Sequence, residues 1–495
     1  MNKNVRCFFL IIVIALIMMG CKKQDILAND TLIDDDFNGL DLEKINHYDI
    51  EVRLDYEDKI YTCKQEILYV NNTDRVLGEL YFHLYPNAFK TVDRAPILFS
   101  NTPGAEKSYK GGYMNIESVS RDDKDLEYTI QGEDETILYI KLNEPLLKGQ
   151  KTTIHMEYEV VIPTAKDRFG YGNRVINAGN WYPIACVYDE DGWNLEPYYR
   201  LGDPFYSDVS NYNVSIYTDR DVVIASSGNI LSEDIEDNKK IYKIEGKLIR
   251  DFAWAASKDF KIAEGKVDDT LIKLYYLDRV DSMVEKSIKI GEDSIEIFNR
   301  VFGKYPYGVY SIVMTEFPSG MEYPGIVFIG EEYFRNSLKD MLEQVIVHET
   351  AHQWWYGLVG NDEVREAWLD EALTTYSEVI YHKELYGLRR GEGYFIENIK
   401  LGYEYGEGYL TGDRVVNKPL GDFVGWNDYG ILVYTKGAMF IDDIKTIYGE
   451  DILYKIFRTY FNRYRFYNAR TEDFIKVCEE VTNTDFGDLV QRWLY

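Results

Sequence analysis

The sequence predicts an α+β protein in which an antiparallel β-domain precedes a domain of strands and then helices. Short runs of alternating apolar and polar residues recur between about residues 45 and 255, as expected for half-buried strands. Strand-like runs continue from about 262 to 329. Beyond them, apolar residues recur at helical spacing to the end of the chain.

The N-terminus predicts export and a lipid anchor. Lys3 and Arg6 precede an apolar run of 13 residues, Cys7 to Met19, too short to span a bilayer as a mature helix, which needs about 20 residues. Residues 18–21, Met-Met-Gly-Cys, are similar to a bacterial lipobox with cleavage before Cys21. We therefore expect residues 1–20 to be a lipoprotein signal peptide and Cys21 to carry lipid at the extracytoplasmic face of the cell membrane. An ordinary secretory signal and an uncleaved anchor remain alternatives.

The segment after Cys21 is polar and acidic, so residues 21–44 are predicted to be a tether. The β-domain is predicted to span residues 45–255, with strands such as 61–70 and 212–217. A second domain is expected at residues 256–495, beginning after Asp-Phe-Ala-Trp-Ala at 251–255.

The most informative motif is His-Glu-x-x-His at residues 348–352, within an apolar run that predicts a helix over 341–358. A separation of four residues is about 400° of helix, so His348 and His352 point the same way and can reach one ion. Eighteen residues separate His352 from Glu371, on a second predicted helix at about 366–383. This pattern predicts a zinc ion, one per chain, held by His348, His352 and Glu371.

Three protein ligands leave the fourth position of a tetrahedral zinc ion open, which indicates catalysis. Glu349 is turned about 100° from His348 on the same helix. It therefore lies beside the metal, where a general base for a water molecule belongs. The chemistry implied is hydrolysis of an amide.

Two further motifs have both a structural and a functional interpretation. Residues 318–325, Pro-Ser-Gly-Met-Glu-Tyr-Pro-Gly, predict a turn and an edge strand. Glu322 in this motif would either bind a free α-ammonium or be a solvated loop residue. Tyr434, in Tyr-Thr-Lys-Gly, would either stabilise an oxyanion or simply begin a helix.

The ordered set Gly-Met-Glu-Tyr-Pro, His-Glu-x-x-His with a distant Glu, and Tyr-x-Lys-Gly resembles the M1 family of zinc aminopeptidases. The resemblance runs from about residue 45 to the end and implies a thermolysin-like catalytic domain. It implies that peptides with a free N-terminus are the substrates. It also implies roles for individual residues: zinc binding by His348, His352 and Glu371, general base catalysis by Glu349, oxyanion stabilisation by Tyr434, and substrate binding by Gly320, Met321 and Glu322.

The chain departs from the family pattern at Tyr323, where the family commonly has Asn. Larger members continue into a helical C-terminal domain, and the sequence predicts none here. Thermolysin-like endopeptidases fit less well, because their pattern around the third ligand differs from Asp-Glu-Ala-Leu-Thr-Thr at 370–375. Epoxide hydrolysis and a non-catalytic binding lipoprotein on a peptidase fold remain alternatives.

The chain has 55 basic and 84 acidic residues, a net charge of −29. Nucleic-acid binding is disfavoured, because neutralising phosphates requires clustered Lys and Arg.

Overall fold

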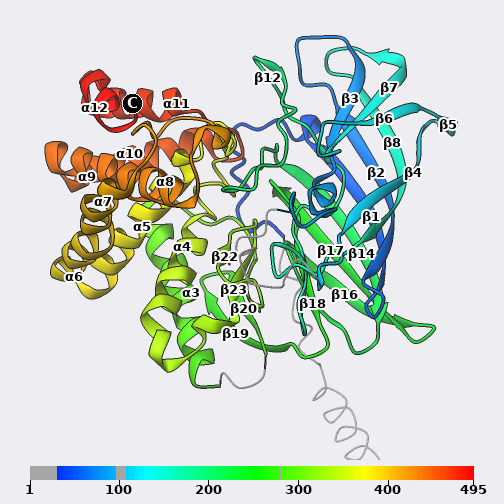
Figure 1. The fold of residues 1–495 in the computed structure, drawn as a ribbon, viewed down its shortest axis with the longest axis horizontal. Helices are drawn as coiled ribbons and strands as arrows, with labels where there is room; N and C mark the ends of the chain where they lie inside the picture. Colours follow the sequence, from blue (N-terminus) through cyan, green and yellow to red (C-terminus); the bar gives the residue numbers. More distant parts are fainter. Residues whose placement is uncertain (1–30, 96–107, 278–280) are drawn as a thin grey trace, which may run out of the picture.

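The computed structural model describes residues 31–95, 108–277 and 281–495. Figure 1 shows a β-rich part on one side and a helical part on the other, with a smaller sheet between them. The structure confirms the α+β fold class. Cys21 and the predicted signal peptide lie outside the described residues.

The largest sheet of the β-rich part has eight strands in the order β16-β17-β14-β1-β2-β8-β4-β5. Alternation explains its two faces: in β2 every second residue from Tyr61 is buried and the residues between are mostly exposed. The strands are β1 (Asn46–Asp55), β2 (Ile60–Val70), β4 (Tyr113–Arg121), β5 (Lys124–Asp125), β8 (Lys151–Val161), β14 (Ser210–Asp219), β16 (Asn229–Glu236) and β17 (Lys239–Ile249).

Two four-stranded sheets and a two-stranded ribbon complete this part. The first sheet contains β15 (Val223–Ser226), β18 (Trp254–Ser257), β10 (Ile176–Ala178) and β9 (Phe169–Tyr171). The second contains β11 (Ile184–Ala185), β3 (Leu77–His83), β7 (Ile137–Leu146) and β6 (Glu127–Gln131), and the ribbon is β12 (Tyr188–Asp189) with β13 (Gly192–Trp193).

One pairing departs from the predicted antiparallel arrangement. β1 pairs with β2 antiparallel but with β14 parallel, from Asn46↔Ser210 to Arg53↔Tyr217. Alternation within a strand specifies which face is buried, and it does not specify the direction of a neighbour that is distant in the sequence.

The central sheet has the order β19-β20-β21-β23-β22, with β22 at its edge. Its strands are β19 (Lys261–Val267), β20 (Thr270–Tyr276), β21 (Val309–Thr315), β22 (Gly320–Met321) and β23 (Ile326–Gly330). All strands of the central sheet follow residue 260, and all strands of the other sheets precede residue 258. The domain boundary between residues 255 and 256 stays a prediction.

The helices are α3 (Asp281–Val301), α4 (Lys339–Ala351), α5 (Trp368–Tyr386), α6 (Leu388–Tyr394), α7 (Leu401–Gly406), α8 (Trp426–Tyr429), α9 (Gly437–Tyr448), α10 (Glu450–Tyr464), α11 (Thr471–Thr482) and α12 (Gly487–Trp493). Two π-helical turns, η5 (Phe395–Lys400) and η8 (Gly430–Lys436), pack against each other. Short 3₁₀ turns are η1 (Leu42–Lys44), η2 (Tyr85–Phe89), η3 (Glu331–Tyr333), η4 (Asn336–Leu338), η6 (Glu407–Tyr409) and η7 (Leu420–Asp422).

The helix predicted over residues 341–358 is wrong at its C-terminal end, because α4 stops at Ala351. The chain then turns sharply, and Tyr356 has a φ of +121°. The apolar run continues through this turn because its residues are buried, so hydrophobicity did not reveal where the helix ends.

The described part of the predicted tether, residues 31–44, lies against the folded body. Leu32 forms an antiparallel bridge with Tyr307. Ile33 N–H donates to the Pro306 carbonyl at 2.8 Å, and Asp36 pairs with Arg465. From Thr31 onward the chain is therefore attached to the body of the protein. Among the helices of the described residues, none has the length and apolar character to cross a membrane.

Candidate metal centre and active site

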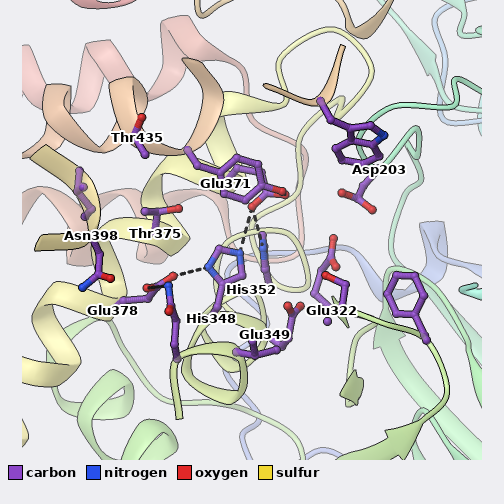
Figure 2. Close-up of a pocket in the computed structure, with 18 of the residues that line it drawn as sticks. Asp203, Glu322, His348, Glu349, His352, Glu371, Thr375, Glu378, Asn398 and Thr435 are labelled. Carbon is purple, nitrogen blue, oxygen red and sulfur yellow. Dashed lines mark hydrogen bonds and ion pairs between the residues drawn. The ribbon is translucent and has the colours of Figure 1, made fainter. Parts of the chain in front are cut away.

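Two adjacent helices present the predicted metal ligands. His348 lies in the last turn of α4, His352 caps that helix, and Glu371 lies in the first turn of α5. Their ligand atoms all lie within 4.8 Å of one another. Glu371 Oε2 is 3.3 Å from the Nε2 atoms of both histidines, and Figure 2 shows the three side chains converging.

The other nitrogen of each imidazole is held by a hydrogen bond. His348 Nδ1 donates to Glu378 Oε1 at 2.7 Å, and His352 Nδ1 donates to the Trp355 carbonyl at 3.0 Å. These contacts leave both Nε2 atoms facing Glu371. Two imidazole nitrogens and one carboxylate fit a catalytic zinc ion, and the hydrogen bonds at Nδ1 orient both imidazoles towards it.

The charges at this centre are strongly coupled. Burial alone would raise the pKa of Glu371, but the positive charge of His352 and the hydrogen bonds from both imidazoles lower it to about 2. Burial would lower the pKa of His348, but hydrogen bonds to Glu371 and Glu378 raise it well above its usual value. The carboxylates thus favour positive charge on the imidazoles between them. A divalent cation bound at the same place would supply that positive charge instead.

Glu349 lies beside the three predicted ligands, and its carboxylate is also within 4.8 Å of ligand atoms of His352 and Glu322. It is buried, and its carboxylate packs on the backbone of Gly320, where an added Cβ would meet Oε1 at 1.9 Å. Burial raises the pKa of Glu349 to about 8, with His348 opposing the shift and Glu371 adding to it. Gly320 therefore provides the space that Glu349 needs.

The motif at 318–325 forms edge strand β22, which pairs with β23. Glu322 follows β22 and is 4% exposed, and its Oε1 has no hydrogen-bond partner among the described residues. Burial raises the pKa of Glu322 well above its usual range, and the charges of Asp203 and Glu349 raise it further. The charge of Arg168 opposes this shift, but no cation of the described residues forms an ion pair with Glu322.

The two neighbours of Glu322 lie in the core. Met321 is buried and does not line the cavity, although the resemblance implied substrate binding. Tyr323, which replaces the common Asn of the resembling family, donates its hydroxyl to Asn180 Oδ1 at 2.6 Å. It thus joins the motif to the β-rich part.

Tyr434 projects from the π-helical turn η8 to the metal ligands. Its hydroxyl donates to Glu371 Oε1 at 2.5 Å, and its ring stacks near His348 with centroids 5.9 Å apart. Burial raises the pKa of Tyr434 well above its usual value, and Glu371 raises it further. The hydroxyl therefore stays protonated and able to donate.

Among the predicted site residues that the structure describes, all except Met321 line one cavity of about 300 Å³. Figure 2 shows Asp203 and Glu322 on one side of the metal ligands and Thr375, Asn398 and Thr435 on the other. The cavity thus extends to both sides of the predicted metal ligands, and Glu378 lies on the same side as Thr375 and Asn398.

The family resemblance implies that the β-rich part contributes to the amine pocket, with Asn177 as the candidate residue, but sequence reasoning missed the residues that line the cavity. Asp203 and Arg168 both line it, and Arg168 Nη1 donates to Asp203 Oδ1 at 2.5 Å. Asn177, a candidate for this role, instead donates to the Asp167 carbonyl at 2.9 Å and does not line the cavity. The available signal was the Asp between Gly202 and Pro204, a charged residue in a segment of turn formers.

Comparison with known proteins finds one matching family. The model of the peptidase family M1 domain matches residues 287–493, which include every predicted site residue except Cys21. This part of the chain is therefore similar to the M1 peptidases. The fold of the chain is similar to the crystal structure of the M1 zinc metallopeptidase from Deinococcus radiodurans, with a TM-score of 0.65, 13% identity, and coverage of 91% of this chain and 94% of that one.

Curated proteins similar to this chain carry aminopeptidase names. Aminopeptidase N of Streptomyces lividans is 29% identical over 38% of this chain and 23% of that protein. Probable aminopeptidase 1 of Saccharolobus solfataricus is 20% identical over 84% of this chain and 52% of that protein. The chain therefore spans only part of the length of the curated relatives that it matches.

Proposed function

We propose that this protein is an M1 family zinc aminopeptidase that removes N-terminal residues from peptides. The observation that carries the proposal is the buried, unpartnered carboxylate of Glu322 in the cavity that holds the three metal ligands. A substrate α-ammonium would supply the missing cation and place the first peptide bond beside the metal. The Deinococcus metallopeptidase supports the proposal, because a mutant of that protein was crystallised with a Tyr-Ser-Ala substrate.

His348, His352 and Glu371 would hold the ion. A zinc ion there would polarise the scissile carbonyl and make a water molecule more acidic. Glu349 would accept the proton of the attacking water and deliver it to the leaving amine. Its burial next to Gly320 keeps competing solvent away from that carboxylate.

Tyr434 would donate its hydroxyl hydrogen bond to the oxyanion as the carbonyl becomes tetrahedral. This donor now bonds Glu371, so it needs only to change acceptor within the same centre. Edge strand β22 would hold the extended peptide by main-chain hydrogen bonds.

The first test compares an aminoacyl p-nitroanilide with its N-acetylated form. We expect the zinc-loaded protein to cleave only the free amine, because Glu322 requires an ammonium partner. Glu349→Gln should retain zinc but lose turnover by at least about a thousandfold. Equal cleavage of both substrates would exclude the exopeptidase assignment, and an active Glu349→Gln would exclude the assigned base.

We further propose that Cys21 anchors the enzyme to the outside of the cytoplasmic membrane, on the strength of the sequence at residues 18–21 alone. Radiolabelled palmitate should be incorporated into the wild-type protein in a bacterial host and not into Cys21→Ser. Equal labelling of the two would exclude the anchor without affecting the enzymatic proposal.

A further inference from the structure

The turn that follows the metal-binding helix contains a backbone outlier. Tyr356, four residues after His352, has a φ of +121°, in a region that a bulky residue occupies only when its surroundings impose it. Its N–H donates to the Val359 carbonyl at 2.9 Å, and its side chain is buried. The conformation is thus fixed by contacts on both sides of the residue.

This conformation directs two successive carbonyls to different donors. The Trp355 carbonyl accepts from His352 Nδ1 at 3.0 Å, which fixes the tautomer of that imidazole and turns its Nε2 towards Glu371. The Tyr356 carbonyl accepts from Arg250 Nε at 2.8 Å. The Tyr356 backbone joins the two carbonyls. A hydrogen bond that fixes the Tyr356 carbonyl therefore also restricts the orientation of the Trp355 carbonyl.

Arg250 belongs to the β-rich part and follows β17. Its side chain is 1% exposed. No carboxylate of the described residues forms an ion pair with it, although the charge of Asp208 partly offsets the effect of burial, which lowers the pKa of Arg250. Its guanidinium instead donates to neutral groups of three segments: the Ser207 carbonyl, the Tyr356 carbonyl, and the Tyr467 carbonyl with Asn468 Oδ1.

Burying an unpaired guanidinium is expensive, and the fold also reserves space for it. A Cβ on Gly360 would lie 2.1 Å from Arg250 Cζ, so this position of the same turn admits only glycine while Arg250 stays in place. The turn is therefore shaped around the guanidinium as well as around the imidazole.

We propose that Arg250 is a positioning residue for the metal centre: by holding the Tyr356 carbonyl it keeps the Trp355 carbonyl on His352 Nδ1. It touches neither substrate nor metal. The inference rests on the proposed zinc site, and it makes metal affinity in the helical part depend on a residue of the β-rich part.

The test measures zinc affinity of the folded protein by competition with a chromophoric chelator. Arg250→Met keeps the apolar stem and removes every donor, so we expect zinc to bind 10- to 100-fold more weakly. The d–d spectrum of the cobalt-substituted protein should change as well. The matched control is Asn468→Ala, which removes another contact of Arg250 but leaves the bond to Tyr356 intact, and it should keep wild-type affinity and spectrum.

A purely structural role would lower the melting temperature of the metal-free protein and leave both metal readouts unchanged. Wild-type affinity in folded Arg250→Met therefore overturns the proposal. If that variant does not fold, Arg250→Lys is assessed in the same way: a loss of about tenfold supports the role, and unchanged affinity refutes it. Failure of the proposed function would show differently, as a wild-type protein that binds no zinc or cleaves no peptide.

Discussion

At the residue scale, the proposed function makes substrate selection depend on Glu322, whose Oε1 has no hydrogen-bond partner among the described residues. Glu322 is buried among other acidic groups, and Asp203 and Glu349 make its ionisation costly. An incoming ammonium would relieve this repulsion, so the same burial that destabilises the free carboxylate strengthens its bond to a free N-terminus.

Replacing Glu322 should therefore weaken reaction with free amines specifically. We expect Glu322→Gln to lower kcat/KM for an aminoacyl p-nitroanilide roughly 100-fold, about 3 kcal/mol, because a buried charge pair is lost. Glu331→Gln, on the neighbouring turn η3 and outside the cavity, should retain wild-type kinetics. Similar losses in both variants would count against an amine-binding role.

Tyr434 should affect the chemical step more than binding. Tyr434→Phe removes the hydroxyl and keeps the ring against His348, so we expect kcat to fall roughly 100- to 1,000-fold with little change in KM. Tyr429→Phe is a suitable control, because its ring packs edge-on against Tyr434 and its hydroxyl bonds no described residue. A rise in KM at constant kcat would instead assign Tyr434 to ground-state binding.

At the scale of elements, α5 carries both a predicted metal ligand and the carboxylate that orients another predicted ligand. Glu371 and Glu378 are seven residues apart, close to two turns, so both face α4. Glu378 also accepts from Gln344 at 3.2 Å and from the Tyr394 hydroxyl. These contacts anchor the carboxylate that holds His348.

Loss of this carboxylate should weaken metal binding. We expect Glu378→Gln to lower zinc affinity 10- to 100-fold, measured by chelator competition, because His348 loses a charged acceptor. Glu384→Gln is the matched change on the same helix, at a residue that pairs with Arg300 away from the centre. If the two variants retained equal affinity, the orientation of His348 would not depend on Glu378.

The sequence predicted α5 and the approach of its ligand to α4, because helical spacing determines which side chains share a face. It did not predict the end of α4. Residues 352–360 are as apolar and buried as the helix, and the turn is imposed by partners distant in sequence, such as Arg250 and Tyr467. For the same reason the contribution of Asp203 was missed, since its place in the cavity depends on how separate sheets pack.

At the scale of the whole molecule, buried titratable groups outside the active site couple folding to pH. His83, at the end of β3, is 1% exposed, stacks on Tyr85 with centroids 4.6 Å apart, and has no described partner for Nδ1. Burial lowers the pKa of His83 from 6.5 to about 4. As pH falls the unfolded chain takes up this proton first, so stability is complete above pH 6.5 and is lost between pH 6.5 and 4.

Replacing His83 should flatten part of this pH dependence. We expect the loss of unfolding free energy between pH 7.5 and pH 5 to be about 2 kcal/mol smaller in His83→Phe than in the wild type. Urea denaturation with excess chelator measures this difference without a contribution from metal release. An unchanged difference between the two pH values would mean that His83 is protonated in the folded state.

The attachment of Thr31–Ile33 to Pro306–Gly308 limits how far the folded protein can lie from a membrane to which Cys21 is anchored. If Cys21 carries lipid, nine residues, Lys22 to Asp30, separate the membrane surface from the first attached residue. Fully extended, they span at most about 30 Å, less than the width of a protein of this size. The enzyme would therefore work close to the lipid headgroups with one side towards them, and peptides would have to enter its cavity from the space beside the membrane.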